Sequence, residues 1–330
     1  MKNQDHTPFE ASSRKTVLSR PGAKYDRLIA RAKTVQPAVT LVVYPCDESS
    51  LRGAIEAANE GIIEPVLVGP MRRIKETAKK HDILIDGIQI VDAPDENAAA
   101  AKAVAMVREA KGELLMKGSL HTDDLMRQVT SGSTGLRTQR RISHVFIMDV
   151  PTYSETLFIT DAAINISPDL DAKRDIVQNA IDLFTQVGLG RPRVAILSAV
   201  ETVTSKIPST LDAAALCKMA DRRQITDADL DGPLAFDNAV DPDAARIKGI
   251  TSAVAGRAQI LVVPDLEAGN MLAKNLSFLA KADAAGIVLG ARVPIVLTSR
   301  ADSVRSRLAS CAVAVLYADA RRHVATVTAA

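Results

Sequence analysis

Short runs of aliphatic, mostly β-branched residues alternate with alanine-rich amphipathic stretches, and this alternation limits the possible folds more than any other feature of the chain. Unbroken apolar runs indicate strands buried on both faces, and they occur at residues 40–44, 65–68, 88–91, 144–150, 157–160, 194–199, 260–263, 287–289 and 295–298. Helical stretches lie between them, at 48–61, 96–111, 171–188, 209–223 and 267–283, after a first helix near 24–35. The order predicts an α/β fold with mostly parallel sheets, helices on both faces and ligands at the carboxyl ends of strands.

The length of the chain and one break in its rhythm predict two lobes. A chain of 330 residues, of which 47% are hydrophobic, can bury two domain-sized cores. Residues 1–22 are polar and aperiodic, which indicates an arm ahead of the folded part. A polar, basic stretch at 130–144 interrupts the alternation and predicts a boundary between Ser143 and His144.

The charge balance and the cysteines argue against several classes of protein. Lys and Arg total 41 against 39 Asp and Glu, so no broad field would attract nucleic acid or an anionic membrane. Arg137, Arg140, Arg141 and His144 form a basic cluster without interleaved aromatic residues, and a solvated face is favoured over nucleic-acid binding. The three cysteines lack disulfide or zinc spacing and are expected to be inert. With no apolar run of about 20 residues and no signal peptide, a cytoplasmic protein is expected.

The richest candidate site follows the apolar run at 295–298, where a helix is expected to begin at once. Helix N-terminal amides, the Ser299 hydroxyl and the forked Arg300 guanidinium can together bind a phosphoryl group without a metal. Alternatively, Ser299 caps the helix, Asp302 interacts with its dipole and Arg300 is solvated, and composition alone favours this alternative.

Other strand ends carry weaker signals. Gly290 and Arg292 allow close approach of a ligand to the backbone, or equally tight strand packing. Asn270 and Lys274, one helical turn apart, suit an anionic ligand or an ordinary capped helix. Asn165 follows an apolar run and is a candidate ligand contact, although polar turn chemistry explains such positions as well.

A further group surrounds a strand-to-helix turn in the first half of the chain. Lys117 and His121 flank this turn, and Arg127 lies about two turns into the helix, where it could clamp an anion. A lone histidine is more often structural than functional. The chain contains no Walker loop, no G-x-G-x-x-G after the first strand, no H-E-x-x-H and no G-x-S-x-G, which weighs against kinases, Rossmann dehydrogenases and serine hydrolases.

Six ordered segments between about residues 39 and 316 resemble the phosphate acetyl/butyryltransferase family, especially its phosphate butyryltransferase-like branch. They are MKGSLHT (116–122), TDAAIN (160–165), AAALCKMAD (213–221), DGPLAFDNA (231–239), PDLEAGN (264–270) and PIVLTSRADS (294–303). The resemblance implies a two-lobed fold of the isocitrate/isopropylmalate-dehydrogenase type with a cleft between the lobes. The first lobe would comprise 23–143 plus 301–330 and the second 144–300, usually in a homodimer.

The resemblance also implies the reversible reaction acyl-CoA + phosphate ⇌ acyl phosphate + CoA. The thiolate would attack directly in a ternary complex, with CoA or acetyl-CoA as substrate and no permanently bound cofactor or metal. The family's phosphate-binding residues map onto Ser299, Arg300 and Arg127. Ser306 stands where acetyltransferases of the family carry a catalytic aspartate, so Asp302 or His121 would take the proton.

Two alternatives remain beside an acetyl- or butyryltransferase, with acetyl favoured as the acyl group. One is a non-catalytic acyl-CoA or acyl-phosphate binding protein that lost its base at Ser306. The other is a metal-dependent decarboxylating dehydrogenase of the same fold, although Asp161, Asp237 and Asp265 are not spaced as a magnesium site would need.

Overall fold

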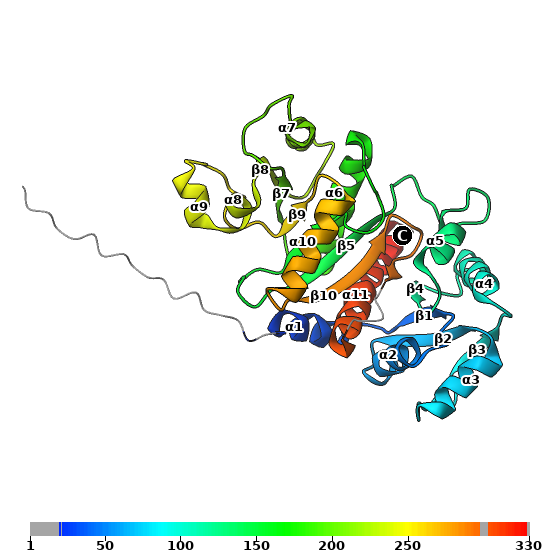
Figure 1. Ribbon diagram of the computed structural model, residues 1–330. Coiled ribbons are helices and arrows are strands. Elements are labelled where there is room, and N and C mark those ends of the chain that lie inside the picture. Colours follow the sequence, from blue (N-terminus) through cyan, green and yellow to red (C-terminus); the bar gives the residue numbers. More distant parts are fainter. Residues whose placement is uncertain (1–19, 21, 298–302, 329–330) are drawn as a thin grey trace, which may run out of the picture.

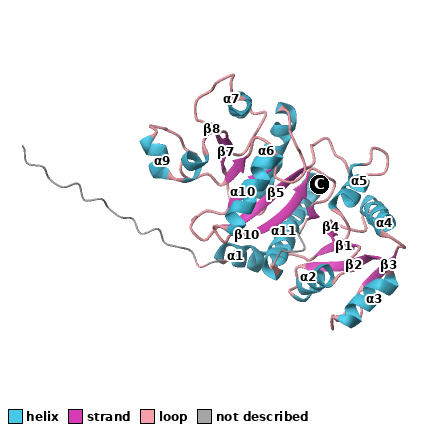
Figure 2. Cartoon of the chain, viewed as in Figure 1, coloured by secondary structure: helices cyan, strands magenta, loops and turns pink. Residues whose placement is uncertain are grey.

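The computed structural model describes residues 20, 22–297 and 303–328, which form an α/β structure around one large sheet (Figures 1 and 2). The strands are β1 Ala38–Val43, β2 Ile63–Gly69, β3 Gln89–Asp92, β4 Leu114–Lys117, β5 Ser143–Asp149, β6 Leu157–Thr160, β7 Arg193–Leu197, β8 Asp229–Leu234, β9 Ile260–Val262, β10 Asp283–Leu289 and β11 Ile295–Val296. The helices are α1 Ala23–Ala32, α2 Glu48–Asn59, α3 Met71–Lys80, α4 Glu96–Arg108, α5 Thr122–Thr130, α6 Leu170–Gln186, α7 Pro208–Asp221, α8 Phe236–Val240, α9 Pro242–Ile247, α10 Leu266–Phe278 and α11 Val304–Thr328.

The strands form one continuous sheet in the order β3-β2-β1-β4-β11-β10-β5-β6-β9-β7-β8. All pairs are parallel except β10 with β11, β10 with β5, and β5 with β6. Because β10 runs against β11, the start of β10 lies at the same edge of the sheet as the carboxyl ends of β4 and β11. That edge brings together segments that are far apart in the sequence.

Helices cover both faces of the sheet, as the sequence predicted. One face packs against α1, α2, α3, α6, α7 and α11. The opposite face packs against α4 and α5 over one half and against α8 and α10 over the other. In β5 the side chains alternate as a pleated strand requires: Val145 and Ile147 enter the first core, while His144, Phe146 and Met148 point to the opposite face.

Two differences between the expected and the observed helix boundaries bear on the site. The helix expected at 267–283 ends at Phe278, and Asp283 instead begins β10, which pairs with β5 from Asp283 to Leu289. The alanine-rich segment has helical propensity, but pairing with a buried neighbouring strand overrides it. The last helix begins at Val304 rather than directly after Arg300, and the Ser303 hydroxyl oxygen accepts a hydrogen bond from the Ser306 amide (3.1 Å). Ser303 is thus the N-cap of α11, and Ser299 lies outside the described residues.

Helix α1 is anchored to the end of β5 through a buried ion pair. Lys24 Nζ lies 3.4 Å from Asp149 Oδ1 and donates hydrogen bonds to the carbonyl oxygens of Val150 (2.7 Å) and Tyr153 (2.6 Å). Burial lowers the pKa of Lys24, and Asp149 opposes this effect. The Tyr25 hydroxyl donates to the Asp283 carbonyl at 3.0 Å, so the anchor also fixes the start of β10. The division into lobes at Ser143 stays a prediction.

Candidate active site

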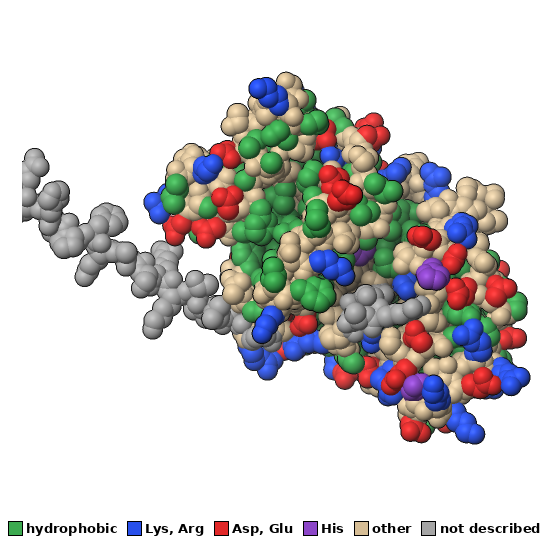
Figure 3. Space-filling model, viewed as in Figure 1, with side chains coloured by type: hydrophobic (Ala, Val, Ile, Leu, Met, Phe, Trp, Pro, Cys, Tyr) green, Lys and Arg blue, Asp and Glu red, His purple; other side chains and the backbone are tan. Residues whose placement is uncertain are grey.

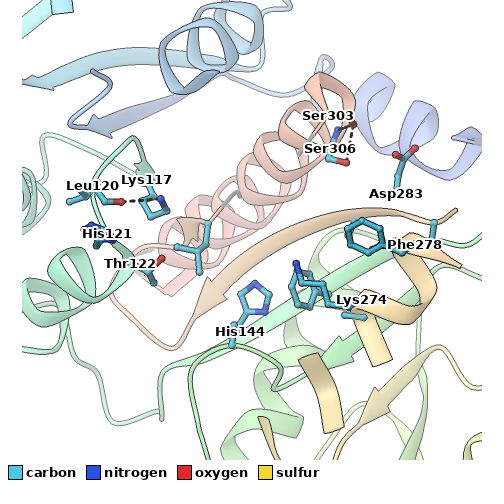
Figure 4. A pocket seen from close by; sticks show the side chains of 17 residues that line it. Lys117, Leu120, His121, Thr122, His144, Lys274, Phe278, Asp283, Ser303 and Ser306 are labelled. Atoms are coloured by element: carbon cyan, nitrogen blue, oxygen red, sulfur yellow. Dashed lines mark hydrogen bonds between the residues drawn. The ribbon is translucent and has the colours of Figure 1, made fainter. Parts of the chain in front are cut away.

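A cavity of about 550 Å³ opens between α5 and α10 (Figure 4). It lies over the central strands of the sheet, between the half that α4 and α5 cover and the half that α8 and α10 cover. Its walls come from seven parts of the chain: the β4–α5 turn, β5, the turn after β6, α10, the start of β10, the residue after β11 and the start of α11. The polar and charged side chains on these walls are Lys117, His121, Thr122, His144, Lys274, Ser277, Asp283, Ser303 and Ser306.

The β4–α5 turn supplies Lys117 and His121. Lys117 ends β4 and is 9% exposed, and its Nζ donates to the carbonyl oxygens of Gly118 and Leu120, both at 3.1 Å. The turn lies tightly on β1, since the Gly118 amide bonds to Val43 O (2.8 Å) and a side chain at Gly118 would collide with that oxygen. His121 occupies the N-cap position of α5 and is exposed at the cavity.

Helix α10 forms the facing wall with Lys274 and Phe278, which lie one turn apart. Lys274 is exposed and makes no hydrogen bond or ion pair with any described residue. The Phe278 side chain is 77% exposed although it lines the cavity. The wall therefore offers a positive charge and an apolar surface to whatever enters.

Asp283 places a carboxylate at the third wall, beside the start of α11 (Figure 4). Partial burial raises the pKa of Asp283; Arg305 counteracts this, and Asp149 adds to it. Ser306, where the resemblance expected an acid, lines the same wall and is 4% exposed. Its hydroxyl accepts a hydrogen bond from the Ser303 hydroxyl at 3.1 Å.

His144 lies at the floor of the cavity and is 1% exposed. Its ring packs edge-on against Phe146, with centroids 4.4 Å apart and an interplanar angle of 76°. Burial lowers the pKa of His144 to about 4, although the negative charge of Asp161 opposes the shift. The imidazole is therefore neutral at physiological pH, and its Nδ1 atom is buried without a hydrogen-bond partner.

Of the residues singled out from the sequence, Lys117, His121 and Lys274 meet at this cavity. Ser299, Arg300 and Asp302 lie outside the described residues, but Leu297 and Ser303, the nearest described residues on either side, both line the cavity.

The remaining sequence candidates do not line the cavity. The Arg127 side chain is 63% exposed on α5 and donates to Asp124 Oδ1 at 2.9 Å. Gly290, with φ +84°, and the exposed Arg292 follow the carboxyl end of β10, whereas Asp283 lies at its start. Asn270 contacts the Ala162 carbonyl at 3.4 Å. For all four, a role in substrate binding stays a prediction.

The Asn165 side chain makes its hydrogen bonds within the protein interior instead. Its Nδ2 donates to Asp161 Oδ2 (2.6 Å) and to Ile142 O (2.9 Å), and its Oδ1 accepts from Arg141 Nε (2.8 Å). Asp161 also accepts from the amides of Ala163 and Ile164, both at 3.0 Å. This network holds the turn after β6 that carries Ala163 to the cavity wall.

Sequence reasoning missed His144 and Asp283 as site residues. His144 had been grouped with a basic surface cluster, although a histidine within a run of apolar strand residues was a signal that it faces the interior. Asp283 was hidden in a segment assigned to a helix, and only its pairing with Asp149 in β5 brings it to the cavity.

The charges on the surface are mixed, as the balanced composition led us to expect, and the cysteine thiols have raised pKa values. Side chains of both charges are interspersed on the face shown in Figure 3, without a large region of one sign. Burial raises the pKa of Cys46 to about 11 and those of Cys217 and Cys311 to about 12. Within the described ranges, no group of three or more His, Cys, Asp or Glu side chains could hold a metal ion, and no helix is long and apolar enough to cross a membrane.

A cavity of this kind, at strand ends in an α/β sheet and lined by lysines and a neutral histidine, is typical of an enzyme that binds anionic substrates. Residues 96–315 match the family model described as "Phosphate acetyl/butaryl transferase". The chain is 72% identical to the phosphate acetyltransferase of Rhizobium meliloti, across 93% of this chain and 97% of that protein. It is 39% identical to the phosphate butyryltransferase of Clostridium beijerinckii, across 89% and 97%. The chain belongs to the phosphate acetyl/butyryltransferase family.

Solved structures agree with this assignment. The branched-chain phosphotransacylase of Enterococcus faecalis V583 superimposes with a TM-score of 0.74 at 29% identity, covering 85% of this chain and 99% of that one. The fold alone extends to 4-hydroxythreonine-4-phosphate dehydrogenase from Klebsiella pneumoniae, with a TM-score of 0.53 at 13% identity over 86% and 99% of the two chains. The predicted family and the dehydrogenase-like fold class are both confirmed.

Proposed function

We propose that this protein is a phosphate acetyltransferase that catalyses acetyl-CoA + phosphate ⇌ acetyl phosphate + CoA. The observation that carries the proposal is the 72% identity to a phosphate acetyltransferase over nearly the full length of both chains. Relatives named butyryltransferase are more distant, at about 39% identity, which supports acetyl over butyryl as the acyl group.

The cavity suits the chemistry of this reaction. Phosphate and the diphosphate of CoA are anions, and Lys117 and Lys274 carry positive charge on two facing walls. Positioning the thiol in line with the acyl carbonyl supplies most of the rate gain in such a direct transfer, and hydrogen-bond donors neutralise the developing charge. Ser299 and Arg300 are proposed to hold the phosphate, and Asp302 or His121 to take the proton of the thiol.

The test is turnover with acetyl, propionyl and butyryl phosphate as alternative acyl donors to CoA, followed by the absorbance of the thioester formed. We expect the highest kcat/KM with acetyl phosphate, and full activity with EDTA present and NAD absent. Tight CoA binding without turnover would instead favour a non-catalytic binding protein. A requirement for a metal and NAD would favour the dehydrogenase alternative.

We also propose that the protein acts in the cytoplasm as a homodimer. The proposed location follows from the substrates, since CoA and acyl phosphates are made and consumed inside cells. Light scattering coupled to size-exclusion chromatography tests the oligomeric state, because one chain has a mass of 35.2 kDa and a dimer would have twice that mass.

A further inference from the structure

We propose that His144 donates a hydrogen bond from Nε2–H to the carbonyl oxygen of the acyl group and stabilises the negative charge that develops on this oxygen. The inference rests on the proposed function, because it assigns a role within acyl transfer. His144 lies on β5, whereas the phosphate-binding residues inferred from the sequence come from other segments.

The burial of the His144 ring and its lack of hydrogen-bond partners identify the ring nitrogen that can bind a substrate. His144 is 1% exposed, and its Nδ1 is inaccessible and has no hydrogen-bond partner. No hydrogen bond from Nε2 to a described residue is found either, yet Nε2 is not among the inaccessible atoms, so it is the ring nitrogen that opens to the cavity. Figure 4 shows the ring projecting from its strand into this space.

The environment also selects the tautomer. A proton on Nδ1 would be a buried donor without an acceptor, which costs about 1–3 kcal/mol. On Nε2 the same proton faces the cavity, where a substrate oxygen can accept it. The neutral imidazole therefore presents an N–H group to the cavity.

The protonation state favours a donor over a base. Burial keeps the imidazole neutral at physiological pH, and its low basicity makes it a weak acceptor for the proton of a thiol with a pKa of about 8.5. A neutral imidazole can still polarise a carbonyl group, as is known from other enzymes in which burial or a helix dipole keeps a histidine neutral.

Neighbouring residues hold the ring in this orientation and keep space in front of it. Phe146 packs edge-on against one side. On the adjacent strand β10, a Cβ atom at Gly286 would lie 2.9 Å from His144 Nε2 and 2.7 Å from the Leu297 carbonyl oxygen. The absence of a side chain at Gly286 therefore leaves Nε2 accessible.

In the proposed step, the CoA thiolate sulfur attacks the carbonyl carbon of the acyl phosphate. A C–S bond forms, the bond from this carbon to the phosphate oxygen breaks, and its electron pair leaves with the phosphate. Between these events the carbonyl oxygen carries the negative charge. His144 keeps its proton throughout and stabilises the charge by a hydrogen bond.

The experiment compares His144→Phe, which keeps an aromatic ring but has no donor, with His144→Gln, whose side-chain amide can donate from a similar position. Turnover is measured with acetyl phosphate and CoA, and folding is checked by circular dichroism and thermal melting. We expect kcat of His144→Phe to fall about 100- to 1,000-fold, as for the loss of other donors to a developing oxyanion, with the KM for CoA changed by less than about threefold. His144→Gln should retain kcat within about tenfold of wild type.

Normal kcat in His144→Phe would overturn the inference while the wild-type turnover still supported the proposed function. Equal loss in His144→Phe and His144→Gln, with both variants folded, would overturn it too, because a donor would then not restore the rate. If His144→Phe does not fold, His144→Leu takes its place in the comparison. A wild-type protein without turnover would refute the proposed function itself.

Discussion

Protonation of His144 should destabilise the folded protein as the pH falls, and the size of this effect follows from its burial. The pKa of His144 is lowered to about 4 in the fold, whereas a histidine in an unfolded chain has a pKa of about 6.5. Between these values the unfolded state binds a proton that the folded state does not. The contribution of the neutral His144 to the free energy of unfolding is therefore fully present above about pH 6.5, and it is lost as the pH falls toward 4.

The expected magnitude follows from this difference in proton binding. At about pH 5, the free energy of unfolding should be about 2 kcal/mol lower than at about pH 7.5 through this residue alone. Other groups also respond to pH, so the quantity to compare is the change in wild type minus the change in His144→Gln, which cannot bind the proton.

The assay is urea unfolding of wild type and His144→Gln at both pH values. A parallel His323→Gln variant is the control for loss of an imidazole, since the His323 side chain is 76% exposed to solvent. We expect wild type to lose about 2 kcal/mol more than His144→Gln on going to the lower pH. Equal losses in the two proteins would mean that His144 titrates as it does in the unfolded chain, and the argument from its burial would be refuted.

Two further substitutions test the surroundings of the site. Gly286→Ala should destabilise the protein by about 1–3 kcal/mol through overpacking and lower kcat by displacing His144. Gly132→Ala is the matched control, because an added Cβ at Gly132 has no neighbour within 4 Å. Equal thermal midpoints and rates of the two variants would contradict the close approach of Gly286 to His144. Arg300→Ala should reduce turnover by about 100-fold or more in an assay of CoA release or consumption, by analogy with other groups that stabilise transferring charge; normal turnover would show that Arg300 does not hold the phosphate.

Much of the fold could be predicted from the sequence, because strands buried on both faces are recorded locally as unbroken apolar runs. The run at 157–160 coincides with β6, and the helices at 48–61 and 96–111 begin where α2 and α4 begin. Their starts are determined by neighbouring side chains: Asp47 and Asp95 each accept a hydrogen bond from an amide of the first helical turn. Such information lies within a few residues and needs no tertiary structure.

The site was only partly predictable for a related reason. Lys117 and His121 stand at a strand-to-helix turn, and the sequence marks such turns, so their place near a ligand cavity could be anticipated. The partners of Asn165, by contrast, are Ile142 O, Arg141 Nε and the Asp161 carboxylate, and these contacts direct its side chain to the interior. In the sequence alone, a polar residue after a strand looks the same whether it faces a ligand or bonds to its neighbours in the interior.

The sequence by itself determined the α/β class, most of the strands, and through six resembling segments the family. Tertiary structure alone decided that Asp283 begins a strand, because its pairing with β5 outweighs the helical propensity of the alanines around it. It also decided the character of His144. The low pKa comes from burial of the ring, which the negative charge of Asp161 only partly opposes. The accessible Nε2 depends on Phe146, which packs against the ring, and on the missing side chain at Gly286 of the neighbouring strand. Burial is a property of the assembled sheet rather than of any segment.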